Sequence, residues 1–153
     1  MKPCVLFVGR TRYRLPLSPG LARKFAALHA EFDLHVLGSA PAGAPTRGDG
    51  FVLVRRLRPR ALDGIAFWLA LPFRTARLLR GLEPDAVVSQ SPYEAAAVLV
   101  ARRLARSRAK VVLDVHGDWR SATRLYGSPL RFLLSPIADA VARVAVKIGR
   151  AHV

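Results

Sequence analysis

The sequence predicts an α/β fold in which helices cover both faces of a parallel β-sheet. Two short apolar runs, residues 3–8 and 85–89, lack the two-residue alternation of half-exposed strands, which is typical of strands buried on both faces. Segments with helical spacing separate such runs along the chain. Strands that alternate with helices form parallel sheets joined by crossover helices, and this order defines the fold class.

The first half of the chain adds one helix and two strands to the opening strand. Ser18 is a favourable N-cap and Pro19 suits the first helical position, so a helix is expected to begin there. The apolar face of this helix consists of Leu21, Phe25 and Leu28. Residues 33–37 and 51–57 are the next predicted strands. Residues 38–50 between them are rich in glycine, alanine and proline and are expected to form a loop.

The second half continues the alternation. Residues 65–80 form a helix in which Pro72 predicts a kink or a break. After the strand at 85–89, the segment 91–94 (Ser-Pro-Tyr-Glu) combines a capping box with a helix-starting proline, the strongest local signal in the chain. Residues 110–115 form the fifth predicted strand.

Composition limits the class of protein. The chain has 153 residues, the size of one domain, and a globular hydrophobic content of 52%. No apolar stretch approaches the roughly 20 residues of a membrane span, and Arg10 interrupts the apolar start that a signal peptide would need, so we expect a cytoplasmic protein. The single cysteine, Cys4, excludes a disulfide framework and a cysteine-based zinc site; we expect a buried core thiol and no metal.

The formal charge of +15 predicts an anionic partner, which is a nucleic acid, an acidic lipid or a phosphorylated substrate. The alternative is a basic composition spread over solvated helix faces.

Residues 148–153 are the translation of a common sequencing adapter, whose next codon in that frame is a stop. We therefore expect residues 147–153 to be read-through rather than native sequence, and residues 1–146 to be an incomplete part of a longer protein.

Ligands of such folds bind at the carboxyl ends of the strands, near the point where strand order reverses. This rule selects the segments after residues 8, 89 and 115. The first segment places Gly9 where the backbone can approach a ligand and Arg10 beside it, ahead of a helix amino terminus that attracts anions. A phosphate-binding loop is predicted there, with a solvated basic loop as the alternative.

The segment after residue 115 contains His116, Gly117, Asp118 and Trp119. The imidazole of His116 can exchange a proton near neutral pH, Gly117 permits a tight turn, and Trp119 offers an apolar plate for a sugar. We predict that this segment binds substrate; a structural histidine is the alternative. No second histidine lies nearby, which argues against a metal site.

Several motifs together resemble the amino-terminal domain of glycosyltransferase family 4 (group 1). They are the strand ending in VGR, the helix SPGLARKF, the strand–turn–helix DAVVSQSP, and VVLDVHGDWR followed by TRLYGSP, over residues 3–146. The resemblance implies the GT-B fold, in which two Rossmann-like domains enclose the active site. It further implies an acceptor-side domain of a retaining enzyme that moves a hexose from a nucleotide-sugar to a lipid-linked or polysaccharide-precursor acceptor. No cofactor is implied besides that donor.

The resemblance also implies roles for particular residues. His116 matches the catalytic histidine near the donor sugar, and Gly9 and Arg10 match the loop that approaches the donor phosphates and the acceptor. The turn after the fourth predicted strand borders the acceptor cleft and contributes the substrate-binding residues Ser89, Ser91 and Tyr93.

Two departures from the family pattern concern the first loop and the donor site. The double glycine often found after the first strand is absent, which affects the details of phosphate contact. The donor-binding Glu-x7-Glu pair is absent too, so the chain alone is expected to be inactive.

Arginines flank the apolar segment 65–73, and this arrangement suits the surface of an anionic bilayer at the inner face of the cell membrane. The membrane-surface candidates are Arg56, Arg58, Trp68, Arg74 and Arg77. The alternative is a buried helix with a basic outer face. A competing function is a non-catalytic anion- or nucleic-acid-binding Rossmann-like module. Only the charge favours it, because no helix-turn-helix, zinc finger or RNA-recognition motif occurs, so nucleic acid is not an expected partner.

Overall fold

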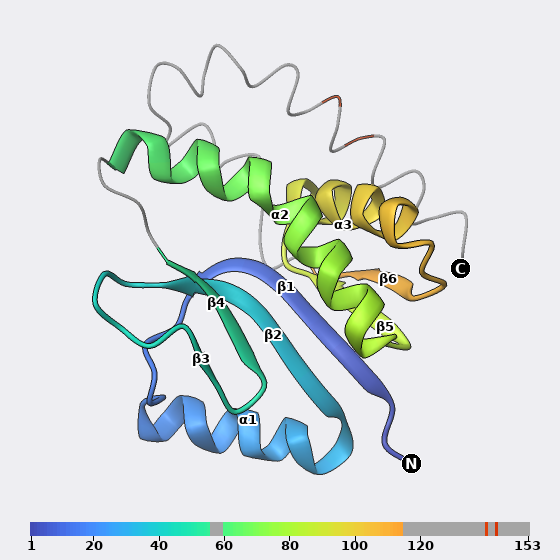
Figure 1. The fold of residues 1–153 in the computed structure, drawn as a ribbon. Coiled ribbons are helices and arrows are strands. Elements are labelled where there is room, and N and C mark those ends of the chain that lie inside the picture. The colour runs from blue at the N-terminus through green and yellow to red at the C-terminus, as the bar shows by residue number, and fades with distance from the viewer. Residues whose placement is uncertain (56–59, 115–139, 141–142, 144–153) are drawn as a thin grey trace.

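The computed structural model describes residues 1–55, 60–114, 140 and 143. In this part of the chain six strands form one sheet in the order β3-β4-β2-β1-β5-β6. The strands are β1 (Cys4–Arg12), β2 (Asp33–Ala40), β3 (Arg47–Gly48), β4 (Phe51–Arg55), β5 (Ala86–Ser89) and β6 (Lys110–Leu113). The helices are α1 (Pro19–Glu31), α2 (Arg60–Leu82) and α3 (Pro92–Ala105) (Figure 1). Every strand pair is parallel except β3–β4, which confirms the predicted Rossmann-like α/β fold.

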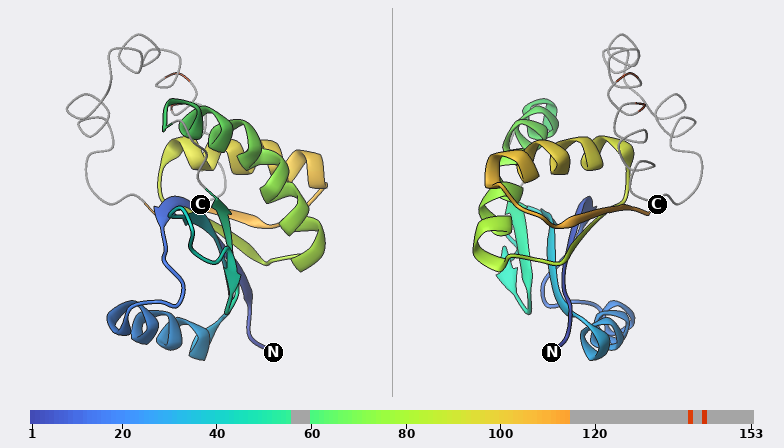
Figure 2. Two further views of the ribbon diagram at one scale, coloured as in Figure 1. Left: turned by 60° about the vertical axis from the view of Figure 1, so that its left-hand side comes forward. Right: turned by 90° about the vertical axis from the view of Figure 1, so that its right-hand side faces the viewer.

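The helices lie on both faces of the sheet. Helix α1 covers one face, and α2 and α3 lie side by side on the other (Figures 1 and 2). Successive side chains of β1 point to opposite faces of the sheet. Leu6 and Val8 belong to the core under α2 and α3, whereas Val5 belongs to the core under α1. A strand buried on both faces is apolar at consecutive positions, which is why the sequence of β1 shows no alternation.

Three aromatic rings hold α1 against the sheet. Phe25 is the buried residue of α1, and its ring meets that of Phe51 on β4 edge-to-face at a centroid distance of 4.9 Å. Tyr13, just beyond β1, packs against Phe25 at 5.7 Å and against Phe51 at 5.2 Å. Edge-to-face contacts of this kind add to the free energy of area burial. This cluster and the partly buried Leu28 hold α1 on the sheet, whereas Leu21, expected on the same apolar face, is exposed.

Helix α2 runs unbroken through Pro72 and changes direction near its middle (Figure 1). The expected kink is thus present without a break, because a proline removes one hydrogen bond and displaces one turn. The inner side of the helix buries Phe67, Leu71 and Leu79.

Several elements differ from the sequence prediction, among them β2, which continues to Ala40 instead of ending at residue 37. Strand β1 extends beyond residue 8 to Arg12, because Arg12 pairs with Ser39 of β2 after an irregularity in the register. The segment 38–50 is not purely a loop, since β3 pairs with β4 as a short hairpin. Asp49 and Gly50 connect the two strands with positive φ values of 46° and 80°, the conformation that an Asp-Gly turn adopts most readily.

The predicted starts of α1 and α3 are confirmed in position, whereas α2 begins at Arg60 rather than at residue 65. Ser18 and Ser91 are the N-caps of α1 and α3, each followed by a proline. Ser18 makes no side-chain capping bond, whereas the hydroxyl of Ser91 accepts from the N–H of Glu94 at 3.4 Å. Cys4 is half-buried at the start of β1, so the expectation of a core thiol is wrong: the first residue of a strand lies at the edge of the core.

Leu71 and Leu69 provide a test of which side of α2 carries the packing energy. Leu71 is 0% exposed and Leu69 is 69% exposed. Leu71→Ala is expected to lower the free energy of unfolding by about 2–5 kcal/mol, because it leaves a cavity in the core. Leu69→Ala should change it by no more than about 0.5 kcal/mol. Urea denaturation curves measure both, and equal losses would contradict this packing.

Candidate functional site

The candidate site lies where the order of the sheet reverses. From β1 the chain adds β2 and β4 on one side and then returns to add β5 and β6 on the other. The carboxyl ends of β1 and β5 are therefore neighbours at the switch point, where ligands bind in open α/β sheets. The residues that meet there are Gly9, Arg10 and Thr11 from β1, and Gln90 to Glu94 from the turn into α3.

Close contacts hold these two segments together. The hydroxyl of Thr11 donates to Oε1 of Gln90 at 2.6 Å, and the backbone N–H of Arg10 donates to Oε1 of Glu94 at 2.8 Å. A Cβ atom at Gly9 would lie 2.9 Å from Oε1 of Gln90, closer than side chains tolerate. The side chain of Gln90 therefore occupies the space beside Gly9, and the expected approach of a ligand to this backbone stays a prediction.

The side chain of Arg10 extends from this junction to α2. Its Nη2 lies 3.9 Å from Oδ2 of Asp63, and its guanidinium carbon lies 5.8 Å from the ring centroid of Phe67. Asp63 is almost fully buried, while the Arg10 side chain keeps 34% of its surface exposed. The charge of Arg10 is thus oriented by α2 and still reachable from solvent, as an anion-binding side chain requires.

Glu94 is a buried acid at the amino terminus of α3. The residue is 5% exposed, and its Oε2 atom is buried without a hydrogen-bond partner among the described residues. Burial raises the pKa of Glu94 above its ordinary value of 4.5, and hydrogen bonds from Arg10, Ser91 and Gln90 oppose that shift. One oxygen of this carboxyl group holds the backbone N–H of Arg10, and the other oxygen has no donor among the described residues.

The remaining described residues predicted for the turn have different surroundings. Ser89 is 0% exposed, and its hydroxyl donates to the carbonyl of Val112 at 3.4 Å, so its side chain holds β5 against β6 and is closed to a ligand. Ser91 caps α3. The ring of Tyr93 is half-buried and meets Trp68 of α2 edge-to-face at 6.4 Å.

Trp68 also packs against Phe67 at 5.7 Å, so it belongs to the margin of the core. The outer side of α2 instead exposes an apolar stripe at four-residue spacing, made of Ile65, Leu69 and Phe73. Arg74 and Arg77, two of the predicted membrane-surface residues, are exposed beside Phe73. No helix in the described part of the chain has the length and hydropathy needed to cross a membrane.

Six predicted residues lie outside the described part of the chain, so their roles stay predictions. They are Arg56, Arg58, His116, Gly117, Asp118 and Trp119.

Three contributors to the site were not predicted from the sequence. Gln90 and Glu94 could have been identified from the sequence, because they closely follow a buried strand, where ligands of such folds bind. Glu94 was assigned only to the capping box. No sequence pattern identifies Asp63, since its contact with Arg10 depends on how α2 packs over β1. Among the described residues, no group of three metal-ligating side chains lies at this edge of the sheet.

Glu94→Gln tests the buried carboxyl. Because the pKa of Glu94 is raised in the folded state, the folded protein binds more protons than the unfolded chain, and stability falls as pH rises from 4.5 through the raised value. The free energy of unfolding of wild type minus that of Glu94→Gln should therefore decrease between about pH 4 and pH 8. Urea denaturation at several pH values measures this difference.

Glu31→Gln is the matched control, because Glu31 is exposed at the end of α1. A wild-type minus Glu94→Gln difference that rises with pH, or that the Glu31→Gln variant reproduces, would contradict the assignment.

Comparisons with known proteins gave one structural similarity and one family match. The structure is similar to that of a lipopolysaccharide outer core galactosyltransferase, WaaB, in its apo form, with 12% sequence identity and a TM-score of 0.47. The similarity covers 76% of this chain and 33% of that one, so the chain spans about a third of that enzyme. No curated protein sequence shows significant similarity to the chain. The family model described as a glycosyl transferase 4-like domain matches residues 18–148. The chain therefore belongs to the glycosyl transferase 4-like domain family.

Proposed function

We propose that the chain is the acceptor-side domain of a retaining glycosyltransferase that moves a hexose from a nucleotide-sugar to an acceptor. The observation that carries the proposal is the family match over residues 18–148. The site geometry supports it, because a partly exposed arginine stands at the switch point of the sheet, where ligands of such folds bind.

Arg10 would pair with a phosphate of the donor. Its guanidinium group is held between Asp63 and Phe67, so little side-chain freedom would be lost on binding. Glu94 would fix the backbone of Arg10, and a ligand that approaches the backbone at Gly9 would displace the side chain of Gln90. Ser91 and Tyr93 would border the acceptor, and the segment 116–119 would complete the site.

His116 is proposed as the catalytic residue, with its imidazole donating a hydrogen bond to the donor sugar. Gly117, Asp118 and Trp119 would bind substrate beside it. The reaction would require no metal and no cofactor besides the nucleotide-sugar.

The donor-binding half is proposed to lie in sequence that follows residue 146 of the native protein, which leaves this chain inactive alone. Long reads of the source locus without adapters test this. A frame that continues for roughly 100–200 residues and encodes a Glu-x7-Glu pair is expected. Genomic DNA that encodes residues 147–153 and then a stop would contradict it.

Sugar transfer by the protein encoded by that frame tests the activity. Radiolabelled nucleotide-hexoses and a lipid extract as acceptor source should yield a labelled product, unchanged by a chelator. His116→Ala is expected to lower kcat by roughly 100-fold or more, as loss of a catalytic histidine commonly does. His29→Ala, on α1, is the matched control. Wild-type turnover in the His116→Ala variant would refute the assigned role.

The acceptor is proposed to be lipid-linked, which would place the protein at the inner face of the cell membrane. The apolar stripe of Ile65, Leu69 and Phe73 is followed by exposed arginines at positions 74 and 77. Apolar side chains beside basic ones on one helix match the chemistry of an anionic lipid surface. Arg56, Arg58 and Trp68 would flank this surface.

Co-sedimentation with vesicles tests the membrane contact. Phosphatidylglycerol vesicles should bind the chain, less so as salt increases, and phosphatidylcholine vesicles should bind it weakly. A Leu69→Ala/Phe73→Ala variant and an Arg74→Gln/Arg77→Gln variant should each lose roughly tenfold in affinity.

The matched control is Leu21→Ala/Arg23→Gln on α1, an exposed apolar and basic pair on the other face of the sheet. Equal losses in this control would show that the membrane contact does not depend on α2.

A further inference from the structure

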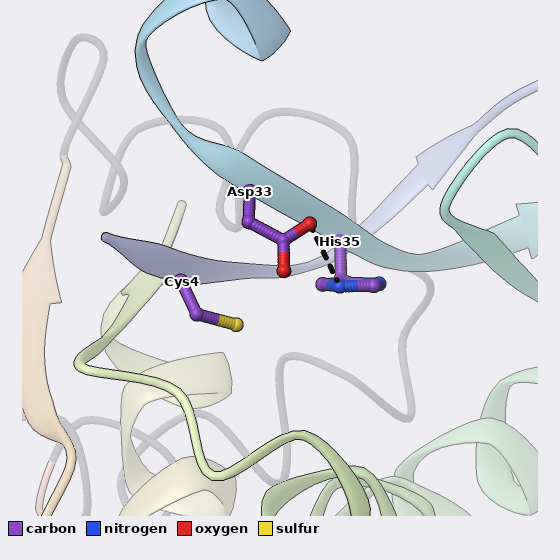
Figure 3. A group of neighbouring side chains, drawn as sticks. All are labelled: Cys4, Asp33 and His35. Carbon is purple, nitrogen blue, oxygen red and sulfur yellow. Dashed lines mark ion pairs between the residues drawn. The ribbon is translucent and has the colours of Figure 1, made fainter. Parts of the chain in front are cut away.

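Three side chains with metal-ligating atoms converge at the amino ends of β1 and β2, on the edge of the sheet opposite the candidate site. Cys4 pairs with Asp33 in the register of these parallel strands. His35 follows Asp33 by two residues and lies on the same face of the sheet (Figure 3). The ligand atoms of all three lie within 4.8 Å of one another.

We propose that Cys4, Asp33 and His35 form a binding site for a divalent transition-metal ion, Zn²⁺ by the chemistry of its donors. The proposal departs from the expectation of no metal that the single cysteine gave, because Asp33 and His35 supply the other two ligands. A thiolate sulfur, a carboxylate oxygen and an imidazole nitrogen are the three donor types that zinc binds in proteins. Three protein ligands leave the fourth tetrahedral position to water.

The distances fit this coordination. Zinc bonds of about 2.0–2.3 Å place tetrahedral ligand atoms roughly 3.4–3.6 Å apart. Oδ1 of Asp33 and Nε2 of His35 are already 3.4 Å apart. The thiol of Cys4 makes a weak contact of 3.9 Å with the carbonyl of Leu82, so a rotation about its Cα–Cβ bond forfeits little. The Asp33 side chain is 61% exposed and can follow.

The local charge also favours a cation, although the whole chain carries +15. The carboxylate groups of Asp33 and Asp85 both lie beside Cys4. Asp85 additionally accepts the backbone N–H of Cys4 at 2.8 Å, which fixes the position of the ligand. The nearest lysine in sequence, Lys2, donates to the carbonyl of His29 at 2.7 Å.

A metal bound here would join the two strands at the centre of the sheet. Its effect would be on the stability of the fold, because the candidate glycosyl-transfer site lies at the other ends of the same strands. Binding to the folded state alone raises stability with metal concentration.

Titration of the untagged 153-residue chain with Co²⁺ tests the proposal. Co²⁺ in a tetrahedral site absorbs visible light, and a thiolate ligand adds a charge-transfer band in the near ultraviolet. Cys4 is the single cysteine of the chain, so that band reports on it alone. One equivalent of Co²⁺ should saturate both signals, and Zn²⁺ should displace it. Cys4→Ser should abolish the charge-transfer band.

His35→Gln and Asp33→Asn should each weaken Co²⁺ binding by at least about tenfold, since even the partners that orient metal ligands contribute that much. His29→Gln and Asp49→Asn, in segments outside the cluster, are matched controls with unchanged affinity. Zn²⁺ should also raise the melting temperature of wild type and controls, but not of Cys4→Ser or Cys4→Ala, whose metal-free circular dichroism verifies that they fold.

Absence of the charge-transfer band in wild type would overturn the proposal. So would a band whose affinity is unchanged in both His35→Gln and Asp33→Asn, because the thiol would then bind metal alone.

Discussion

The pairing of β1 with a parallel strand on each side is the constraint on which the rest of the structure depends. A central strand satisfies its backbone hydrogen bonds through β2 and β5, and both of its faces must then be covered by helices. Leu6 and Val8 therefore meet α2 and α3, while Val5 meets the layer under α1. The apolar run at the start of the sequence and the three-layer architecture have the same cause.

The same pairing determines where polar chemistry can gather. Beyond residue 8 the end of β1 lies beside the turn into α3, and buried groups there need partners because few water molecules reach them. The backbone N–H of Arg10 donates to one oxygen of Glu94, and the guanidinium group of Arg10 reaches the buried carboxylate of Asp63. The result is a polar junction of β1, α2 and α3 whose positive charge remains partly exposed.

Local signals in the sequence predicted the strands, the starts of α1 and α3, and the bend at Pro72. These features depend on neighbouring residues alone, as at Ser91, which is followed by a proline. Contacts between distant segments were not predictable in this way. The extension of β1 requires Ser39 of β2, and the burial of Ser89 requires β6. Cys4 was expected in the core for the same reason: the sequence shows an apolar neighbourhood but not the strand register.

Attachment of α1 through a single buried ring has a consequence for how this part of the chain can change. The ring of Phe25 packs against both Tyr13 and Phe51, whereas most other side chains of α1 are exposed. Substitutions at the exposed positions of α1 then meet little resistance from packing, while position 25 accepts few alternatives of the same shape and the partly buried Leu28 is constrained to a lesser degree. Among related sequences, accepted substitutions should concentrate on α1. The layer of α2 and α3, which carries the polar junction, should accept fewer.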